Sequence, residues 1–234
     1  MNYTLAILTH GEARTLRRAV ESFQEYVTPA PADVQVFADG TRPEVFSSVV
    51  VGTTRSLLGR DTGVASTHPS RQEGFCGATS RLWGLVSNDF SPRNEFVFWL
   101  EHDFVFLRPL DLNPLASLLR TDWRLAQISL IRDAANPDEA RAGGLVASRP
   151  GEFAAQSTPD GDAWLRQESY FTTNPSLMRR AFMAAYPFED DGQDQCEGRY
   201  GIRLRAAGMD FGAWGDGSEW VAHMGVRDDT GFGY

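Results

Sequence analysis

The sequence has 234 residues, of which 42% are hydrophobic, 12% aromatic and 23% charged. This balance is typical of a folded globular chain with one sizeable core, and it excludes disordered, collagen-like and disulfide-scaffold proteins. The formal net charge is -9, and all 22 basic residues are arginines. Such a charge counts against a protein that coats nucleic acid by bulk electrostatics, although a local arginine groove still permits phosphate contacts. We expect residues 1–234 to form a single domain.

The two cysteines, Cys76 and Cys196, stand alone in the sequence. They form neither a CxxC motif nor a zinc-ligand spacing, so the sequence predicts no disulfide framework and no cysteine metal cluster. A reducing cytoplasm is the simpler compartment on this evidence. The sequence also predicts neither a signal peptide nor a membrane-spanning segment.

The first half of the chain alternates short apolar runs with amphipathic stretches. This pattern predicts strands at 4–9, 33–38 and 95–103 and helices at 12–26, 75–86 and 109–119. Residues 52–74 are rich in Gly, Thr, Ser, Arg and Pro and predict a loop. The opening order of strand, helix and strand predicts an α/β fold with a parallel sheet flanked by helices.

The second half has weaker periodicity. Its pattern predicts strands at 123–131, 170–173, 211–214 and 220–223 and helices at 175–185 and 196–207. The intervening residues 132–165, with several Gly and Pro turns, predict an excursion or flexible lid.

Polar residues follow three of the predicted strands: Thr9-His10, Asp39 and Glu101-His102-Asp103. Ligands of open α/β sheets gather beyond the carboxyl ends of the strands, so these side chains are expected around one crevice. Two carboxylates that close the most apolar strand need neutralisation, and Mg²⁺ or Mn²⁺ commonly takes one or two carboxylates plus substrate phosphate oxygens. Asp39 taken alone is more often a helix cap or turn former.

The ordered segments Thr4–Thr9, Asp39–Gly40, Gly74–Gly84 and Glu101–Asp103 resemble the nucleotide-sugar-binding elements of GT-A fold glycosyltransferases, especially those of family 2. The resemblance extends over most of residues 4–225. It implies a Rossmann-like GT-A fold with a central, mostly parallel sheet, Mn²⁺ or Mg²⁺ as cofactor, and a nucleoside-diphosphate sugar as donor, UDP-sugar first. The family usually carries Asp-x-Asp where this chain has Glu101-His-Asp103.

The resemblance also implies roles for single residues. Asp39 would contact the nucleoside base or ribose with Thr9 nearby, and Arg71 and Arg81 would hold the base or the diphosphate. His10 and His102 are further candidates for contact with the donor. Asp103 would bind the metal, Glu101 would assist through water or the sugar nucleotide, and His223 would complete the metal shell.

An inverting transfer needs a base beside the acceptor hydroxyl, because that hydroxyl loses its proton as the sugar carbon is attacked. The family places a carboxylate at the start of a helix that ends in a glycine turn. Glu197 matches this position best and Asp194 is second. The alternative is that the acidic turn before residue 196 only initiates the helix.

The acceptor is suggested by Thr173–Leu177 and Trp220–Gly225, which look similar to the glycosyltransferases associated with TET-type DNA dioxygenases in bacteriophages. Those enzymes attach sugars to hydroxymethylated pyrimidines in DNA, so the resemblance implies a double-stranded DNA acceptor in the host cytoplasm. A cell-surface or small-molecule glycan is the alternative acceptor.

Three other function classes can be compared with these residues. A non-catalytic sugar-binding module stays possible if Glu197 and His223 lie far from the crevice. A nucleotidyltransferase would need a glycine-rich phosphate loop with Arg or Lys, which residues 9–12 do not supply. An HD-type phosphohydrolase carries its His-Asp pair on helices, whereas His102-Asp103 follows a predicted strand.

Overall fold

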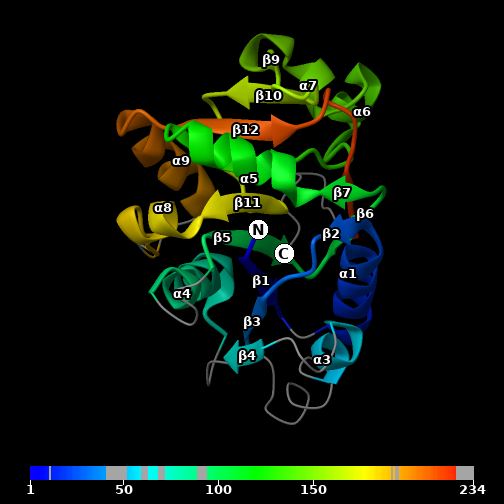
Figure 1. Ribbon diagram of the computed structural model, residues 1–234, viewed down its shortest axis with the longest axis vertical. Helices are drawn as coiled ribbons and strands as arrows, with labels where there is room; N and C mark the ends of the chain where they lie inside the picture. Colours follow the sequence, from blue (N-terminus) through cyan, green and yellow to red (C-terminus); the bar gives the residue numbers. More distant parts are fainter. Residues whose placement is uncertain are drawn as a thin grey trace.

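The computed structural model describes residues 1–10, 12–40, 52–58, 63–67, 72–88, 94–190, 192 and 195–224. Of the predicted site residues, Arg71 and Asp194 lie outside these ranges. A nine-stranded sheet in the order β4-β3-β1-β5-β11-β8-β12-β10-β9 forms the centre of the molecule, and Figure 1 shows it stacked from β4 at the bottom to β10 near the top. Its strands are β1 (Tyr3–Thr9), β3 (Asp33–Ala38), β4 (Gly63–Thr67), β5 (Phe96–Glu101), β8 (Leu125–Leu130), β9 (Ala154–Ser157), β10 (Ala163–Gln167), β11 (Ser176–Arg179) and β12 (Asp210–Trp214).

Strand direction divides the sheet into two parts. β4, β3, β1 and β5 are mutually parallel, whereas β11 is antiparallel to both of its neighbours, β5 and β8. β12 then runs parallel to β8, and β10 and β9 follow in antiparallel pairings. The carboxyl ends of β1, β3, β5, β8 and β12 therefore meet at one edge of the sheet.

Helices cover both faces, with α1 and α3 on one side of the stacked strands and α4, α8 and α9 on the other (Figure 1). The helices are α1 (Ala13–Tyr26), α3 (Gly52–Leu58), α4 (Gly74–Asn88), α5 (Leu112–Thr121), α6 (Pro137–Ala142), α7 (Leu145–Ser148), α8 (Arg180–Ala185) and α9 (Cys196–Ala206), with a 3₁₀ turn at Pro150–Glu152. Two short pairings complete the fold: β2 (Val27–Thr28) with β7 (Leu110–Asp111), and β6 (Phe104–Phe106) with β13 (Val221–His223).

The apolar run of β5 is explained by burial on both faces. Phe98 and Leu100 belong to the core shared with α1 and α5, while Val97 and Trp99 belong to the core shared with α4 and α9. Successive strand residues point to opposite faces, so a strand covered by helices on both sides needs apolar residues at every position. The result is a rigid central strand that carries Glu101 at its end.

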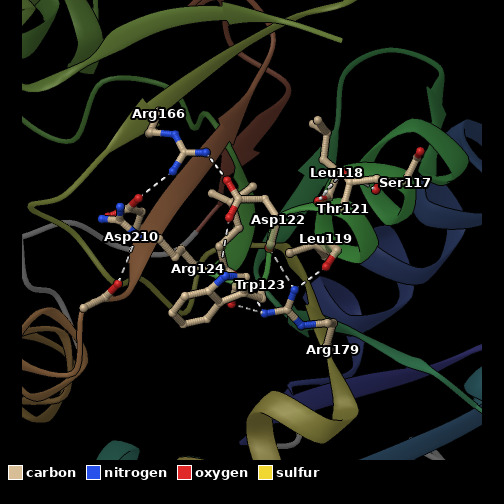
Figure 2. A network of polar contacts seen from close by, with 12 residues as sticks. Ser117, Leu118, Leu119, Thr121, Asp122, Trp123, Arg124, Arg166, Arg179 and Asp210 are labelled. Carbon is tan, nitrogen blue, oxygen red and sulfur yellow. Dashed lines mark hydrogen bonds and ion pairs between the residues drawn. The ribbon is translucent and has the colours of Figure 1, made fainter. Parts of the chain in front are cut away.

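A polar network joins the start of β8 and β12 to the ends of β10 and β11, and Figure 2 shows Arg166 placed between Asp122 and Asp210. Arg124 donates a second hydrogen bond to Asp210, at 3.0 Å. Arg179 donates to backbone carbonyls around the end of α5, including those of Trp123 at 2.7 Å and Leu125 at 2.9 Å. This network lies at the edge of the sheet opposite the carboxyl ends of β8 and β12, where it fixes the second half of the sheet.

The structure corrects several sequence predictions. The segment 52–74 is not all loop, because α3 forms there and β4 pairs with β3. Residues 170–173 form no strand, and the helix expected at 175–185 begins as β11 and becomes α8 only at Arg180. The segment 132–165, expected as an excursion or flexible lid, contains α6, α7, β9 and the start of β10. In the strands that the sequence did not predict, pairing with a neighbouring strand outweighs the local propensity of the residues for loop or helix.

The two cysteines form a disulfide with a Cα–Cα distance of 5.9 Å, which joins α4 to α9. The sequence predicted no disulfide framework, and the pairing of these two distant cysteines corrects that expectation. Disulfides are rare in reducing compartments, so the bond also counts against the expected reducing cytoplasm. Within the described residues, none of the helices has the length and apolar character needed to cross a membrane.

Candidate functional site

A cavity of about 820 Å³ opens at the carboxyl edge of the sheet. Its lining includes most of the predicted site residues, which are Thr9, His10, Asp39, Glu101, His102, Asp103, Glu197 and His223. Two other cavities of about 440 and 560 Å³ in the described part of the chain contain none of them. The strand ends therefore converge as the sequence predicts, and the C-terminal candidates join them.

Backbone hydrogen bonds explain why the three strand ends meet. The amide of Asp39 donates to the carbonyl of Thr9 at 2.7 Å, and the amide of His102 donates to the carbonyl of Leu8 at 3.0 Å. These bonds extend the ladders of β3-β1 and β1-β5 by one residue beyond the strands. The polar residues are thus held by the sheet itself.

Asp103 and His223 are in direct contact, with 2.9 Å between Oδ2 and Nε2. The pairing of β6 with β13 sets His223 opposite Phe104, and the amide of Met224 donates to the carbonyl of Asp103 at 2.6 Å. Burial raises the pKa of Asp103, but the His223 hydrogen bond and the electrostatic effects of the neighbouring imidazoles outweigh it and leave that pKa below its ordinary value. Asp103 therefore stays a carboxylate.

Glu197 lies in the first turn of α9 and is held by Thr173 from the segment before β11. The amide and the hydroxyl of Thr173 donate to Oε1 of Glu197 at 2.5 and 2.6 Å. Burial raises the pKa of Glu197, although the Thr173 hydrogen bonds and the charge of Arg132 oppose the shift. A carboxylate with a raised pKa, held through one oxygen, has the properties of a general base.

Glu101 shares the cavity with both of these acids. Burial, and then the charges of Asp103 and Glu197, raise the pKa of Glu101 well above its ordinary value. Mutual repulsion of buried carboxylates is relieved by a cation among them.

The donor atoms around Asp103 fit a divalent metal. Oδ1 of Asp103 is buried and accepts no hydrogen bond from the residues that the structure describes. Carboxylate oxygens with one imidazole nitrogen form a donor set that suits Mn²⁺. Of the predicted metal residues, Asp103 and His223 are in direct contact, and Glu101 lines the same cavity.

Asp39 has the contacts of a helix cap. Its two carboxylate oxygens accept hydrogen bonds from the amides of Glu73 at 2.7 Å and Gly74 at 3.0 Å, where α4 begins. The side chain is buried and still lines the cavity. Contact with a nucleoside would have to use the remaining lone pairs of the same oxygens.

Arg81 does not line the cavity. Its side chain is 64% exposed, and its Nε lies 3.5 Å from Oε1 of Glu73. Helical periodicity turns this position of α4 away from the sheet edge, and the sequence pattern did not reveal that orientation.

Two arginines that the sequence interpretation missed lie in the cavity wall. Arg132 donates to Oε2 of Glu139 at 2.9 Å, and the guanidinium of Arg149 lies 5.1 Å from the ring centre of Tyr170. Both belong to the segment interpreted as a lid. They bring positive charge to an otherwise acidic cavity. No local sequence motif predicts that these two arginines line it.

His10 and His102 lie edge to face with their ring centres 4.2 Å apart. Burial lowers the pKa of His102 to about 4, so this imidazole is neutral at physiological pH. The pair forms the wall of the cavity next to the start of α1.

Comparison with solved structures identifies the fold. The chain is similar to S. aureus TarS, with a TM-score of 0.63, 12% identity and coverage of 98% of this chain and 38% of that one. It is similar to the mannosyltransferase PcManGT from Pyrobaculum calidifontis, solved in complex with GDP-Man and Mn²⁺, with a TM-score of 0.60, 13% identity and coverage of 96% and 57%.

A third similar structure is CMP:2-keto-3-deoxy-manno-octonic acid synthetase complexed with CTP, with a TM-score of 0.51, 17% identity and coverage of 98% and 93%. This chain spans less than two thirds of the length of TarS and of PcManGT. No protein-family model and no curated protein matches the sequence. At these identities the likeness shows the fold, which is mixed α/β of the GT-A type, as the sequence predicts.

Proposed function

We propose that this protein is a metal-dependent glycosyltransferase that moves a sugar from a nucleoside-diphosphate sugar to an acceptor hydroxyl. The observation that carries the proposal is the meeting of Asp103, His223, Glu101 and Glu197 in one cavity of a GT-A fold. The solved mannosyltransferase with GDP-Man and Mn²⁺ supports it, because a protein of the same fold holds that class of donor and metal.

The donor side would be formed by the strand ends. Asp103 and His223 would hold the ion with Glu101 beside them, and their mutual hydrogen bond would give way to it. A bound divalent cation neutralises the diphosphate leaving group. The nucleotide would lie against the cavity wall that is lined by Thr9, His10, Asp39 and His102. UDP is the first candidate for this nucleotide.

The acceptor side would be formed by the start of α9. Glu197 would take the proton of the acceptor hydroxyl while the oxygen forms a bond to the sugar anomeric carbon and the bond from that carbon to the diphosphate breaks. Thr173 holds Oε1 and leaves Oε2 to accept the proton. Attack opposite to the leaving group inverts the configuration of the sugar.

The acceptor we favour is a 5-hydroxymethylpyrimidine in double-stranded DNA, on the strength of the sequence resemblance at 173–177 and 220–225. A hydroxymethyl group in the major groove is accessible without extensive phosphate contacts, which makes it compatible with the net charge of -9. A cell-surface or small-molecule glycan is the competing acceptor.

Donor turnover tests the enzymatic proposal. Purified protein is incubated with a panel of nucleotide sugars and Mn²⁺, and the release of nucleoside diphosphate is measured. We expect release with at least one donor, a loss of about 10³-fold in Asp103→Ala because the charge at the reacting diphosphate is then unbalanced, and no change in Asp160→Ala at an exposed turn. Asp103→Ala with the turnover of the unmodified protein would refute the proposal.

Mass spectrometry of nucleosides tests the acceptor. DNA containing hydroxymethylcytosine is incubated with the enzyme and the active donor, then digested. A hexose added to hydroxymethylcytosine supports the DNA acceptor. Unchanged nucleosides, together with sugar transfer to a glycan in the same donor screen, would favour the alternative.

A further inference from the structure

A second cluster of metal-ligating side chains lies in the wall of the cavity. His10 follows β1, His102 follows β5, and Glu12 precedes α1, and one ligand atom from each lies within 4.8 Å of the others. The backbone bond from His102 to Leu8 fixes the two strand ends side by side. Three potential ligands from three separate elements thus converge at one point.

This cluster is distinct from the acids around Asp103. Successive residues of β5 alternate between faces, so Leu100 packs toward α1 and Trp99 packs toward α4. His102 lies on the same face as Leu100 and contacts His10 near the start of α1. Glu101 lies on the same face as Trp99, and burial, followed by the charges of Asp103 and Glu197, raises its pKa. The sheet geometry itself separates the two sets.

Neither aromatic stacking nor helix capping accounts for the whole cluster. An edge-to-face contact explains the two imidazoles but gives no role to Glu12. Glu12 occupies the position before the first turn of α1, yet its carboxylate makes no capping hydrogen bond there. That carboxylate is directed to the histidines instead, which is the composition of a two-histidine, one-carboxylate site.

The chemistry of these ligands differs from that of the Asp103 set. Imidazole nitrogen suits Zn²⁺, Co²⁺ and Ni²⁺, whereas carboxylates and phosphates suit Mg²⁺ and Mn²⁺. Zinc bonds to nitrogen and oxygen ligands are about 2.0–2.2 Å, so ligand atoms up to 4.8 Å apart need only modest rotation to share one ion. His10 and Glu12 are exposed, while His102 is buried and gives the cluster a fixed ligand.

We propose that His10, Glu12 and His102 form a second cation site that binds a borderline metal of the Zn²⁺ or Co²⁺ type. Three protein ligands leave at least one coordination position of such an ion open. Because all three residues line the cavity, this open position faces the space where substrate would bind. An oxygen of a substrate or a water molecule is the ligand expected there.

Metal binding is measured on the untagged 234-residue chain with Zn²⁺ alone and without nucleotide. Calorimetric titration of Asp103→Ala, in which the first metal set is disabled, is expected to show one Zn²⁺ bound per chain. Adding His10→Ala or Glu12→Gln to this variant is expected to weaken Zn²⁺ at least about ten-fold, the range seen when metal-site partners are removed. Glu21→Gln, an exposed change elsewhere on α1, is the matched control and is expected to leave the affinity unchanged.

Cobalt gives a second readout that does not depend on affinity. Co²⁺ added to Asp103→Ala is expected to develop visible absorption that His10→Ala abolishes, and circular dichroism confirms that both variants are folded. If Asp103→Ala binds no Zn²⁺, or binds it equally well after His10→Ala and Glu12→Gln, the second site does not exist. These measurements need no transferase activity, so they stand or fall separately from the proposed function.

Discussion

The two halves of the sheet are held together by different means. β4, β3, β1 and β5 form a regular parallel array in which β1, β3 and β5 lie between two apolar cores, and strand ends are joined by backbone bonds such as the one from Asp39 to Thr9. β8, β11 and β12 reach the same two cores, but the strands of this half mix directions and are joined by arginine contacts, and a disulfide ties the neighbouring α9 to α4. The first half positions residues through its regular pattern, whereas the second half positions them through long-range links.

The largest effect is expected from Glu197→Gln. This variant tests whether the second half of the sheet supplies the catalytic base while the first half binds the donor. Loss of a general base typically lowers a rate by about 10²–10⁴-fold. We expect kcat to fall by this amount while the dissociation constant of the nucleotide sugar stays unchanged. Steady-state kinetics and equilibrium titration of the donor check the two parts.

Glu189→Gln is the matched control, because that side chain is 64% exposed. Since burial raises the pKa of Glu197 and a base acts in its deprotonated form, kcat should also fall with decreasing pH at values above the ordinary glutamate range. A Glu197→Gln enzyme that loses donor affinity and kcat in equal measure would contradict the division of labour between the halves.

Removal of the disulfide is expected to have the next largest effect. Cys76→Ala/Cys196→Ala frees α9 from α4 across a sequence separation of 120 residues. Loss of a native disulfide typically costs about 2–5 kcal/mol, largely because the unfolded chain regains conformational freedom. Urea unfolding should show this loss, and wild type in reductant should approach the double variant.

The double variant in reductant and without it supplies the control, because its stability should not change. Wild type with equal stability in both conditions would show that the cysteines do not stabilise the protein as a pair. That outcome would also remove the objection to a reducing cytoplasm.

The sequence predicts the first half well, because a strand buried on both faces must be apolar throughout and its end must then be marked by polar residues. β1, β3 and β5, together with Thr9, Asp39 and Asp103, follow from this rule. β11 does not, since Ser-Leu-Met-Arg has no strand preference and becomes a strand by pairing with β5 and β8.

The remaining misses are contacts between residues far apart in the chain. The pairing of Cys76 with Cys196 depends on how α4 packs beside α9, and Arg132 enters the cavity only because β8 ends at its edge. Glu197 was found through family resemblance, but its support by Thr173 was not. Local patterns carry no information on such contacts.

Arg166→Ala tests the polar network with a smaller expected effect. Breaking a buried ion pair costs about 3–5 kcal/mol, but Arg166 is 27% exposed and Arg124 still reaches Asp210, so we expect about 1–3 kcal/mol. Arg141→Ala, in a pair whose side chains are 75% and 84% exposed, is the control and should change stability by less than about 0.5 kcal/mol. Equal effects of the two variants in urea unfolding would show that the network does not hold the second half.

The smallest effect, and the most specific one, concerns the pH dependence of the same network. Burial raises the pKa of Asp122, but its hydrogen bond from Arg166, the backbone bond from Arg124 and the charges of these arginines outweigh burial and lower that pKa below its ordinary value. A carboxyl with a lowered folded-state pKa contributes stability above its unfolded-state pKa, about 4, and loses it as the pH falls through the folded value.

Asp122→Asn should therefore be less stable than wild type by a constant amount of about 1 kcal/mol at neutral pH, and this difference should close below about pH 4. Urea unfolding of both proteins between neutral and strongly acidic pH measures the difference, with Asp138→Asn at an 84% exposed position as the control for removing one negative charge. A difference that persists unchanged at the acidic end would mean that Asp122 acts through packing rather than charge. Closure of the difference would show that the Asp122 carboxylate in the second half of the sheet contributes to the acid sensitivity of the fold.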